Sequence, residues 1–200
     1  ASGTVTVSKT HKELTTLAGV STSSTGGSVH NKQIKMDDYI TVIPAQGKAA
    51  NPPAYYNESI RFYQNGATLT VKCAEGAQMT KIVITIANNS AGDGPIAVTG
   101  GTASALTSLK YTITVNSGAS EVVITTKGTD KNSRLYVANL EVSYDILGNS
   151  ECNHPNTVTE TVPPTCTEAG EVIVKCADES CGYVISATEG EPATGHTYED

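Results

Sequence analysis

The sequence predicts an all-β protein: an antiparallel β-sandwich, jelly-roll or immunoglobulin-like, followed by a small module rich in cysteine and histidine. The 200 residues contain no Trp and only 16% charged residues, which is typical of sandwiches. Short segments of alternating apolar and polar residues are separated by turn residues. Four of the five cysteines lie in the last fifty residues. We therefore expect a sandwich domain over 1–147, a linker over 148–150 and a small module over 151–200.

The first elements are a strand and a short helix. Residues 4–7, TVTV, alternate as a strand does. Thr10 and Glu13 have the T-x-x-E spacing of a capping box, and Gly19 is a suitable stop. This pattern predicts a short helix that closes one end of the sandwich.

The next strand and two loops are marked by proline, glycine and asparagine. Residues 39–43 read as a strand that ends at Pro44. Residues 46–57 contain Pro52-Pro53 and are predicted to form an exposed loop. Residues 88–101 are rich in Asn, Gly and Ser, and we expect a second loop there.

Residues 59–87 are the centre of the predicted sandwich. Asn65-Gly66 is a strong signal for a two-residue hairpin, because both turn positions require positive φ. We expect three consecutive antiparallel strands that share one apolar face, and such a face needs a second sheet to cover it. The row of Ile82, Ile84 and Ile86 is predicted to be buried.

Three later strands are predicted over 109–115, 122–125 and 134–144. In the last one the apolar row shifts phase between Val137 and Leu140. A one-residue shift in a period-two pattern predicts a β-bulge near Ala138-Asn139.

Several classes of function are disfavoured. The net charge of -7 argues against nucleic-acid binding, and no apolar run approaches the ~20 residues of a membrane helix. The chain starts without a leader, so we expect that a signal peptide was removed or lies outside this fragment. Cys73 is in phase with buried residues, His11 and His30 are far apart, and no nucleophile-elbow pattern occurs. We predict that the protein is not an enzyme.

The late cysteines and histidines need a cross-link or a metal, because fifty residues hold little core. The favoured ligands of a structural zinc are His154, Cys166, Cys176 and Cys181, with Cys152 and His196 as substitutes. Two disulfides are the alternative in an oxidising exterior, and the four residues between Cys176 and Cys181 suit it. Either role is structural.

A structural calcium in the sandwich is a second metal hypothesis. Loop carboxylates can supply its oxygen ligands, and the candidates are Asp37, Asp38, Asp93 and Asp145. Nothing fixes their spacing, and solvated loop carboxylates are the alternative.

One group of residues suggests a ligand-binding surface. Aromatic rings can stack on sugars, while amide and guanidinium groups bind hydroxyls. The candidates are Tyr55, Tyr56, Asn57, Arg61 and Tyr63. The alternative is that these tyrosines fill the rim of a sheet. If they bind a glycan, Tyr55→Ala or Tyr56→Ala would abolish binding.

Two resemblances add to this reading. The segments MDDYITV, SIRFYQNGATLTV, KIVITI and RLYVANLEVSYD resemble a sandwich domain that recurs in large secreted proteins of gut bacteria. Residues 151–200 resemble a repeat of Gram-positive surface proteins, with the pattern C-x-H, T-C-T-E-x-G, C-G and A-T-G-H-T-Y; that repeat usually has two residues between its later cysteines, not four. The resemblance implies a non-catalytic adhesin or carbohydrate-binding module, secreted or on the cell wall, whose partner is a glycan or a host surface protein. The alternative is a structural stalk with no ligand.

Overall fold

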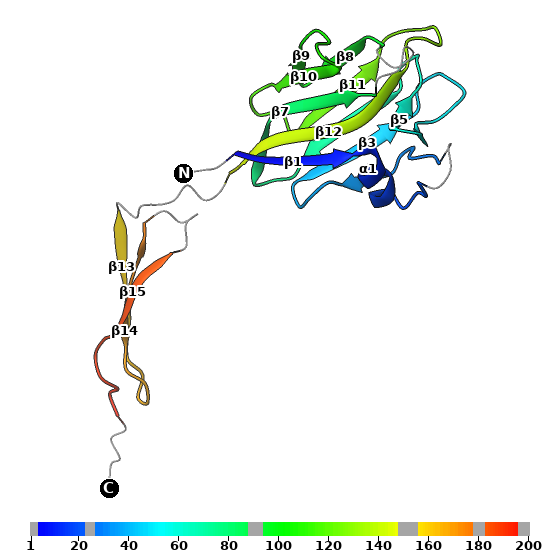
Figure 1. Ribbon diagram of the computed structural model, residues 1–200. Helices are drawn as coiled ribbons and strands as arrows, with labels where there is room; N and C mark the ends of the chain where they lie inside the picture. Colours follow the sequence, from blue (N-terminus) through cyan, green and yellow to red (C-terminus); the bar gives the residue numbers. More distant parts are fainter. Residues whose placement is uncertain (1–3, 23–26, 88–93, 148–155, 178–182, 196–200) are drawn as a thin grey trace. The chain divides into compact units, whose positions relative to one another are not determined.

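The structure is a computed structural model, and it describes residues 4–22, 27–87, 94–147, 156–177 and 183–195. The chain forms two compact units, residues 2–147 and residues 148–200. Each unit is described by itself (Figure 1).

The first unit is an antiparallel β-sandwich, which confirms the predicted fold class. One sheet has the order β4-β5-β12-β7-β10-β9, and β1 also pairs with β12. The second sheet has the order β2-β3-β6-β11-β8. The strands of the first sheet are β1 (Thr4–Thr10), β4 (Ala54–Tyr56), β5 (Ser59–Phe62), β7 (Ala77–Ile86), β9 (Gly101–Ala103), β10 (Lys110–Val115) and β12 (Leu135–Ile146). Those of the second are β2 (Ile34–Lys35), β3 (Ile40–Ala45), β6 (Thr68–Cys73), β8 (Ile96–Thr99) and β11 (Glu121–Thr126).

The strand pairs are nested like those of one long hairpin that has been rolled up. β5 pairs with β12, β6 with β11 and β7 with β10. Between β5 and β8 the chain changes sheet at every connection. This nested antiparallel order is that of a jelly roll, the first of the two sandwich types that the sequence predicted.

The expected hairpin at Asn65-Gly66 is absent, and this prediction was wrong. Both residues have the positive φ that the dipeptide predicts, 64° and 85°. However, β5 and β7 lie in the first sheet, whereas β6 lies between β3 and β11 in the second. Turn residues determine the local backbone but not the partner of the strand that follows, so this turn carries the chain from one sheet to the other.

The core lies between the inner faces of the two sheets. The predicted row on β7 is buried: Ile82 and Ile84 are 0% exposed and Ile86 is 2% exposed. Their neighbours on β12, Leu140 and Val142, are also fully buried. At ~25 cal/mol per Å² of apolar surface, this continuous packing is the main source of stability.

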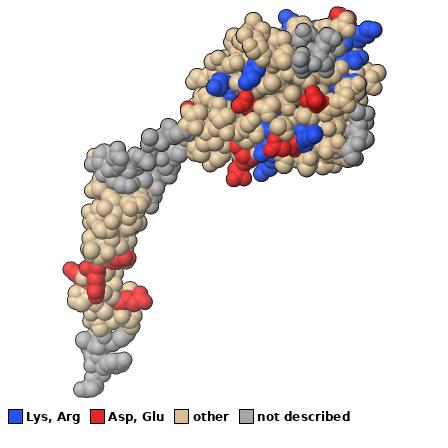
Figure 2. All heavy atoms as spheres, in the orientation of Figure 1, with Lys and Arg blue, Asp and Glu red and all other residues tan. Residues whose placement is uncertain are grey.

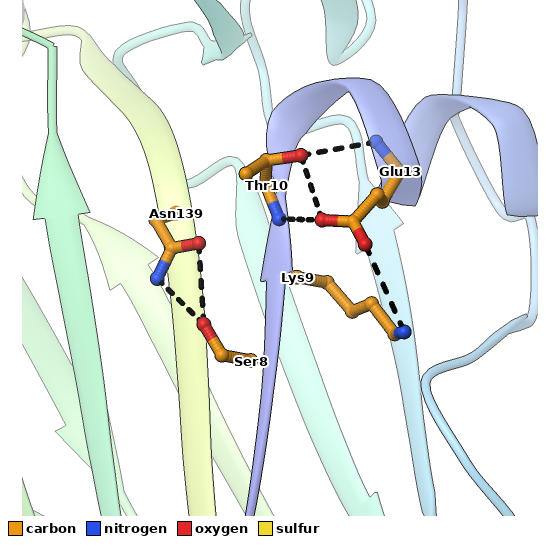
Figure 3. Close-up of polar contacts among 5 residues, drawn as sticks. All are labelled: Ser8, Lys9, Thr10, Glu13 and Asn139. Atoms are coloured by element: carbon orange, nitrogen blue, oxygen red, sulfur yellow. Dashed lines mark hydrogen bonds and ion pairs between the residues drawn. The ribbon is translucent and has the colours of Figure 1, made fainter.

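The predicted helix is present as α1 (His11–Leu17), and its capping box is complete. The Thr10 backbone N–H donates to Glu13 Oε2 at 2.8 Å, and the Glu13 backbone N–H donates to Thr10 Oγ1 at 3.3 Å (Figure 3). The helix ends before Gly19, whose φ is 69°. Leu14 is 2% exposed and joins the core, so α1 covers one end of the sandwich.

The predicted bulge in β12 is confirmed. Val137 pairs with Ile86 and Asn139 with Thr85, which leaves Ala138 without a partner on β7. β12 also changes its other neighbour at this point. Its first part, up to Val137, pairs with β5, and its second part, from Asn139 onward, pairs with β1. Hence β5 and β1 lie end to end along the same edge of β12, with the bulge between them (Figure 1).

Two predicted loops and one predicted strand end needed correction. Residues 46–57 include β4, and residues 88–101 include β8. β3 continues through Pro44 to Ala45. The Pro44 carbonyl accepts a hydrogen bond from the Asn31 N–H, on the side of β3 that faces away from β6. The N–H and carbonyl of one strand residue point to the same side, so the N–H that proline lacks would also face away from β6. Pro44 therefore costs no hydrogen bond between β3 and β6.

The second unit is an antiparallel meander of three strands. They are β13 (Thr157–Val162), β14 (Glu171–Cys176) and β15 (Val184–Glu189), in the order β13-β14-β15. β13 and β15 are exposed along their whole length, and Cys176 is the buried side chain of β14. In the part of the chain that the structure describes, no helix is long and apolar enough to cross a membrane.

Candidate ligand-binding site

A cavity of about 540 Å³ lies beside the β12 bulge, in the gap between β1 and β5. This volume is within the range of ordinary small-molecule sites. Residues from the start of α1, the β4–β5 turn, the end of β7 and the bulge surround it. The lining residues are Thr10, His11, Lys12, Tyr55, Asn57, Glu58, Ile86, Ala87 and Ala138.

His11 connects the helix to the bulge. Its Nδ1 lies 3.2 Å from the Ala138 carbonyl oxygen, an oxygen that the bulge leaves outside the strand ladder. Because a carbonyl can only accept, Nδ1 must carry the proton, and the neutral ring then has its lone pair on Nε2. Nε2 is buried and has no hydrogen-bond partner among the described residues.

The capping box and the end of β1 position His11. The Asn139 side chain donates to Ser8 Oγ at 3.1 Å, which fixes β1 next to the bulge (Figure 3). The pKa of Glu13 is lowered, first by the backbone N–H of Thr10, then by its hydroxyl, and less by Lys9 at 3.9 Å. The ionised carboxylate thus holds the first turn of α1, where His11 lies.

Tyr55 forms one wall of the cavity. It is only 6% exposed, and its ring stacks on His11 with the centroids 5.7 Å apart at 19°. Asn57, with φ of 51°, and Glu58 form the exposed β4–β5 turn, and Lys12 is exposed on α1. The cavity therefore combines apolar walls with an amide, a carboxylate and an ammonium group at its rim.

The predicted set of five ligand residues is divided between two faces of the first sheet. Tyr55 and Asn57 line the cavity. Tyr56, Arg61 and Tyr63 do not, because successive residues of a strand point to opposite faces. The predicted exposed aromatic surface is also corrected: Tyr55 and Tyr63 are 6% and 8% exposed.

Three of these residues belong to a second cluster, which we call the tyrosine–arginine array: Tyr56, Arg61, Tyr63, Arg134 and Tyr136. The Arg61 guanidinium carbon lies 4.0 Å from the Tyr56 ring centroid and 4.7 Å from that of Tyr63. The Arg134 guanidinium carbon lies 4.9 Å from the same Tyr63 centroid. The Tyr56 and Tyr136 rings meet edge to face, with centroids 6.2 Å apart.

The two described cysteines of the second unit lie at opposite ends of its sheet. Cys176 pairs with Thr157, whereas Cys166 lies beyond the end where Val162 pairs with Glu171. A strand of this length spans roughly 17 Å, but two ligands of one zinc lie within about 5 Å of each other. Cys166 and Cys176 thus lie at opposite ends of the sheet, and the structural zinc stays a prediction. The other predicted ligands, Cys152, His154, Cys181 and His196, are outside the described residues.

The predicted calcium ligands that the structure describes are engaged in hydrogen bonds or exposed, and the calcium site stays a prediction. Asp37 accepts hydrogen bonds from the Tyr39 and Ile40 backbones and from the Tyr144 hydroxyl, and Asp145 accepts one from Thr4 at 2.6 Å. Asp38 is exposed, and Asp93 is outside the described residues. Among the residues that the structure describes, no three His, Cys, Asp or Glu side chains are arranged to hold a metal.

The Cys73 thiol and the His30 imidazole, the other reactive side chains considered above, have environments typical of structural residues. Burial, and then the nearby Asp37 carboxylate, raises the pKa of the Cys73 thiol, which packs against the core. His30 Nδ1 accepts from the Gln46 backbone N–H at 3.0 Å. Neither environment activates a nucleophile.

Sequence reasoning did not identify His11, Lys12, Glu58 and Ala138 as neighbours in one site. No protein-family model, curated protein or solved structure shows a significant match to the chain. We therefore infer a function from the geometry of the two clusters.

Proposed function

We propose that the first unit is a non-catalytic carbohydrate-binding module of a secreted or cell-surface protein, with the cavity beside the bulge as its binding site. The observation that carries this proposal is the composition of the cavity: apolar walls from Tyr55 and Ala138, and hydrogen-bonding groups from Lys12, Asn57 and Glu58. A sugar has apolar C–H faces and a ring of hydroxyls, and it needs this combination.

The tautomer of His11 adds one specific contact. Its Nε2 lone pair has no partner among the described residues, and the ring lines the cavity. A small movement of the ring would let Nε2 accept a hydrogen bond from a ligand hydroxyl. The gain would be about 1 kcal/mol for one neutral hydrogen bond.

The charge distribution agrees with a neutral or weakly charged ligand at this site. Lys12 and Glu58 have opposite charges at its rim. Basic and acidic side chains are also interspersed on the face of the sandwich in Figure 2, without the basic stripe that nucleic-acid binding requires.

The proposal is tested with the full chain on a glycan array, followed by calorimetry with any saccharide that binds. Asn57→Ala and Glu58→Gln remove exposed groups from the rim and leave the core intact. Each is expected to weaken binding about tenfold, or ~1.4 kcal/mol. Glu75→Gln, an exposed carboxylate of the β6–β7 turn, is the matched control and should bind normally.

An array without any bound neutral saccharide, or a neutral saccharide bound equally well by both rim variants, would contradict the proposal. Tyr55→Ala is unsuitable as a test because Tyr55 is buried. Its removal would create a cavity and cost about 3–5 kcal/mol of stability.

For the second unit we propose a spacer role. In its described part, a single sheet carries exposed strands at both edges, and no second layer covers it. Acidic side chains gather on this module in Figure 2. A segment of this kind can separate a binding domain from a surface without forming a site of its own.

A further inference from the structure

The tyrosine–arginine array lies on the face of the first sheet that points away from the core. Ile60 and Phe62 of β5 belong to the core cluster, so Arg61 and Tyr63 point to the opposite face. Tyr136 of β12 is directly opposite Arg61 in the strand register and shares that face. Tyr55 is on the other side, so the array is separate from the cavity.

Stacking holds the arginines in place. Tyr63 and Tyr136 are only 8% and 4% exposed, although they lie on an outward face. Arg61 contacts two rings and Arg134 contacts one of the same two. Each cation–π contact contributes about 0.5–1 kcal/mol at an exposed site, and more when water is excluded. The guanidinium groups are therefore pre-organised before any ligand arrives.

Among the described residues, no carboxylate forms an ion pair with either arginine of this cluster. In the described part of the chain the ion pairs are made by lysines, and neither Arg61 nor Arg134 takes part in one. The Nε donors of both arginines are buried and have no hydrogen-bond partner there. Two like charges beside one ring repel each other. An anion between them would reduce that repulsion and accept their N–H donors.

We propose that the tyrosine–arginine array is a second binding site, which takes the carboxylate of an acidic saccharide such as a uronic-acid polymer. A guanidinium group presents two parallel N–H donors that match the two oxygens of a carboxylate. Two guanidinium groups can therefore bind the carboxylates of two successive sugar units, or bind one carboxylate from both sides. The remaining guanidinium donors and the Tyr56 hydroxyl bind sugar hydroxyls. This site does not depend on the cavity and remains if the cavity binds nothing.

The surroundings favour a saccharide over an acidic peptide. A peptide gains main-chain hydrogen bonds by adding to an open strand edge. Here the outer edge of β4 is already occupied, because the Tyr55 N–H donates to the Gly27 carbonyl and Ala54 forms a bridge with Ser28. The array offers charge and side-chain donors instead, and these match a carboxylated sugar.

The test is calorimetry of the full chain with an oligogalacturonate and with a neutral galacto-oligosaccharide of the same length. Only the acidic one is expected to bind, and its affinity should fall as salt is added. Arg61→Gln and Arg134→Gln should each weaken binding about tenfold, and Arg61→Lys should also weaken it, because it keeps the charge but loses the fork. Lys131→Gln, an exposed lysine near Arg134 in the chain, is the control and should bind as the wild type does.

Several results would overturn the proposal. These are the absence of oligogalacturonate binding, binding of the neutral saccharide that Arg61→Gln weakens equally, and arginine variants that fold and bind normally. Tighter binding of poly-glutamate than of oligogalacturonate would reassign the surface to an acidic peptide. Thermal unfolding of each variant shows whether it is still folded, so weaker binding can be assigned to the site rather than to unfolding. Asn57→Ala should leave oligogalacturonate binding unchanged, so failure of the cavity proposal and failure of this one are distinguishable.

Discussion

The Tyr144 hydroxyl donates a 2.7 Å hydrogen bond to the carboxylate of Asp37, a residue 107 positions earlier in the chain. Tyr144 is in β12 of the first sheet, and Asp37 lies just before β3 of the second. The other carboxylate oxygen accepts from the Ile40 backbone N–H at 2.7 Å. This bond joins the two sheets at one end of the sandwich and also fixes where β3 begins.

Replacing Tyr144 with phenylalanine should remove this connection with little change in packing. We expect the free energy of unfolding to fall by about 1–2 kcal/mol, because a hydrogen bond to a charged group is lost and Asp37 keeps only its backbone donors. Urea unfolding measures the effect. Tyr39→Phe is the control, since that ring packs on Tyr144 at 5.6 Å, and it should be nearly neutral. Equal stability of Tyr144→Phe and the wild type would contradict the prediction.

The same tyrosine predicts a dependence of stability on alkaline pH. Burial, followed by its bond to Asp37, raises the pKa of Tyr144 from 10.0 to about 12. Between these values the unfolded chain has lost the Tyr144 proton and the folded chain keeps it. Stability from this group is therefore complete below pH 10 and falls as the pH rises towards 12, by at most ~1.4 kcal/mol per pH unit.

Other groups titrate in that range, so the informative quantity is the difference in unfolding free energy between the wild type and Tyr144→Phe. Unfolding free energies of both proteins are measured from pH 8 to pH 11, or roughly one to two units around the ordinary tyrosine pKa. The gap between them should narrow as the pH rises above 10. A constant gap would show that Tyr144 titrates normally.

Thr10→Ala should destabilise α1 and the cavity together. The loss of an N-cap side chain costs about 1 kcal/mol, and His11 is the next residue. We therefore expect lower stability and weaker saccharide binding in the cavity. Thr16→Ala, at an exposed position later in α1, should have neither effect. Normal saccharide binding by Thr10→Ala would show that the capping box does not position the residues of the cavity.

Acidification should reproduce part of this loss. The pKa of Glu13 is lowered in the folded protein, mainly by the Thr10 N–H and hydroxyl. Its contribution is therefore complete above the ordinary value of 4.5 and is lost as the pH falls through the lower folded pKa. Glu13→Gln should show a weaker dependence of stability on pH in this range. If the stability of both proteins fell equally at acid pH, the ionised Glu13 carboxylate would not stabilise the fold through the capping box.

The two cysteines at opposite ends of the second unit should respond differently to substitution. Cys176 is 5% exposed and Cys166 is exposed. We expect Cys176→Ser to reduce hydrogen-exchange protection of β14 by about 1–3 kcal/mol, because a polar group enters a buried position, and Cys166→Ser to leave it nearly unchanged. Repeating the hydrogen-exchange measurement with EDTA and with a reductant shows whether zinc or a disulfide stabilises this sheet, because EDTA removes zinc and a reductant breaks disulfides. Equal effects of the two substitutions would contradict the prediction.

Local patterns predicted the sandwich well where one segment contains the whole signal. The buried isoleucines of β7, the capping box of α1 and the bulge near Ala138 each follow from a few adjacent residues. The hairpin at Asn65-Gly66 failed because its turn signal is local but the choice of partner strand is not. The backbone took the predicted positive φ, and the strand then paired in the other sheet.

The candidate site was harder to predict for the same reason. His11 and Ala138 were each in a feature that the sequence identified, but they are 127 residues apart, and no pattern joins them. Tyr55 and Tyr56 are adjacent in sequence and were expected to act together. Pairing of β4 with β5 turned them to opposite faces of a sheet and buried the first. Without the order of strands, neighbours in sequence cannot be told from neighbours in space.

The arrangement of β1 and β5 along β12 has a consequence for the time at which the proposed binding site is completed. Within this domain, β1 is synthesised before the other strands and β12 after them, so the pocket wall at Ala138 is added only when the rest of the domain is already made. A nascent or truncated chain that stops before this residue has the helix and the tyrosine but no floor between them. The saccharide binding that we propose for the cavity is thus restricted to chains that have been completed through the end of the sandwich.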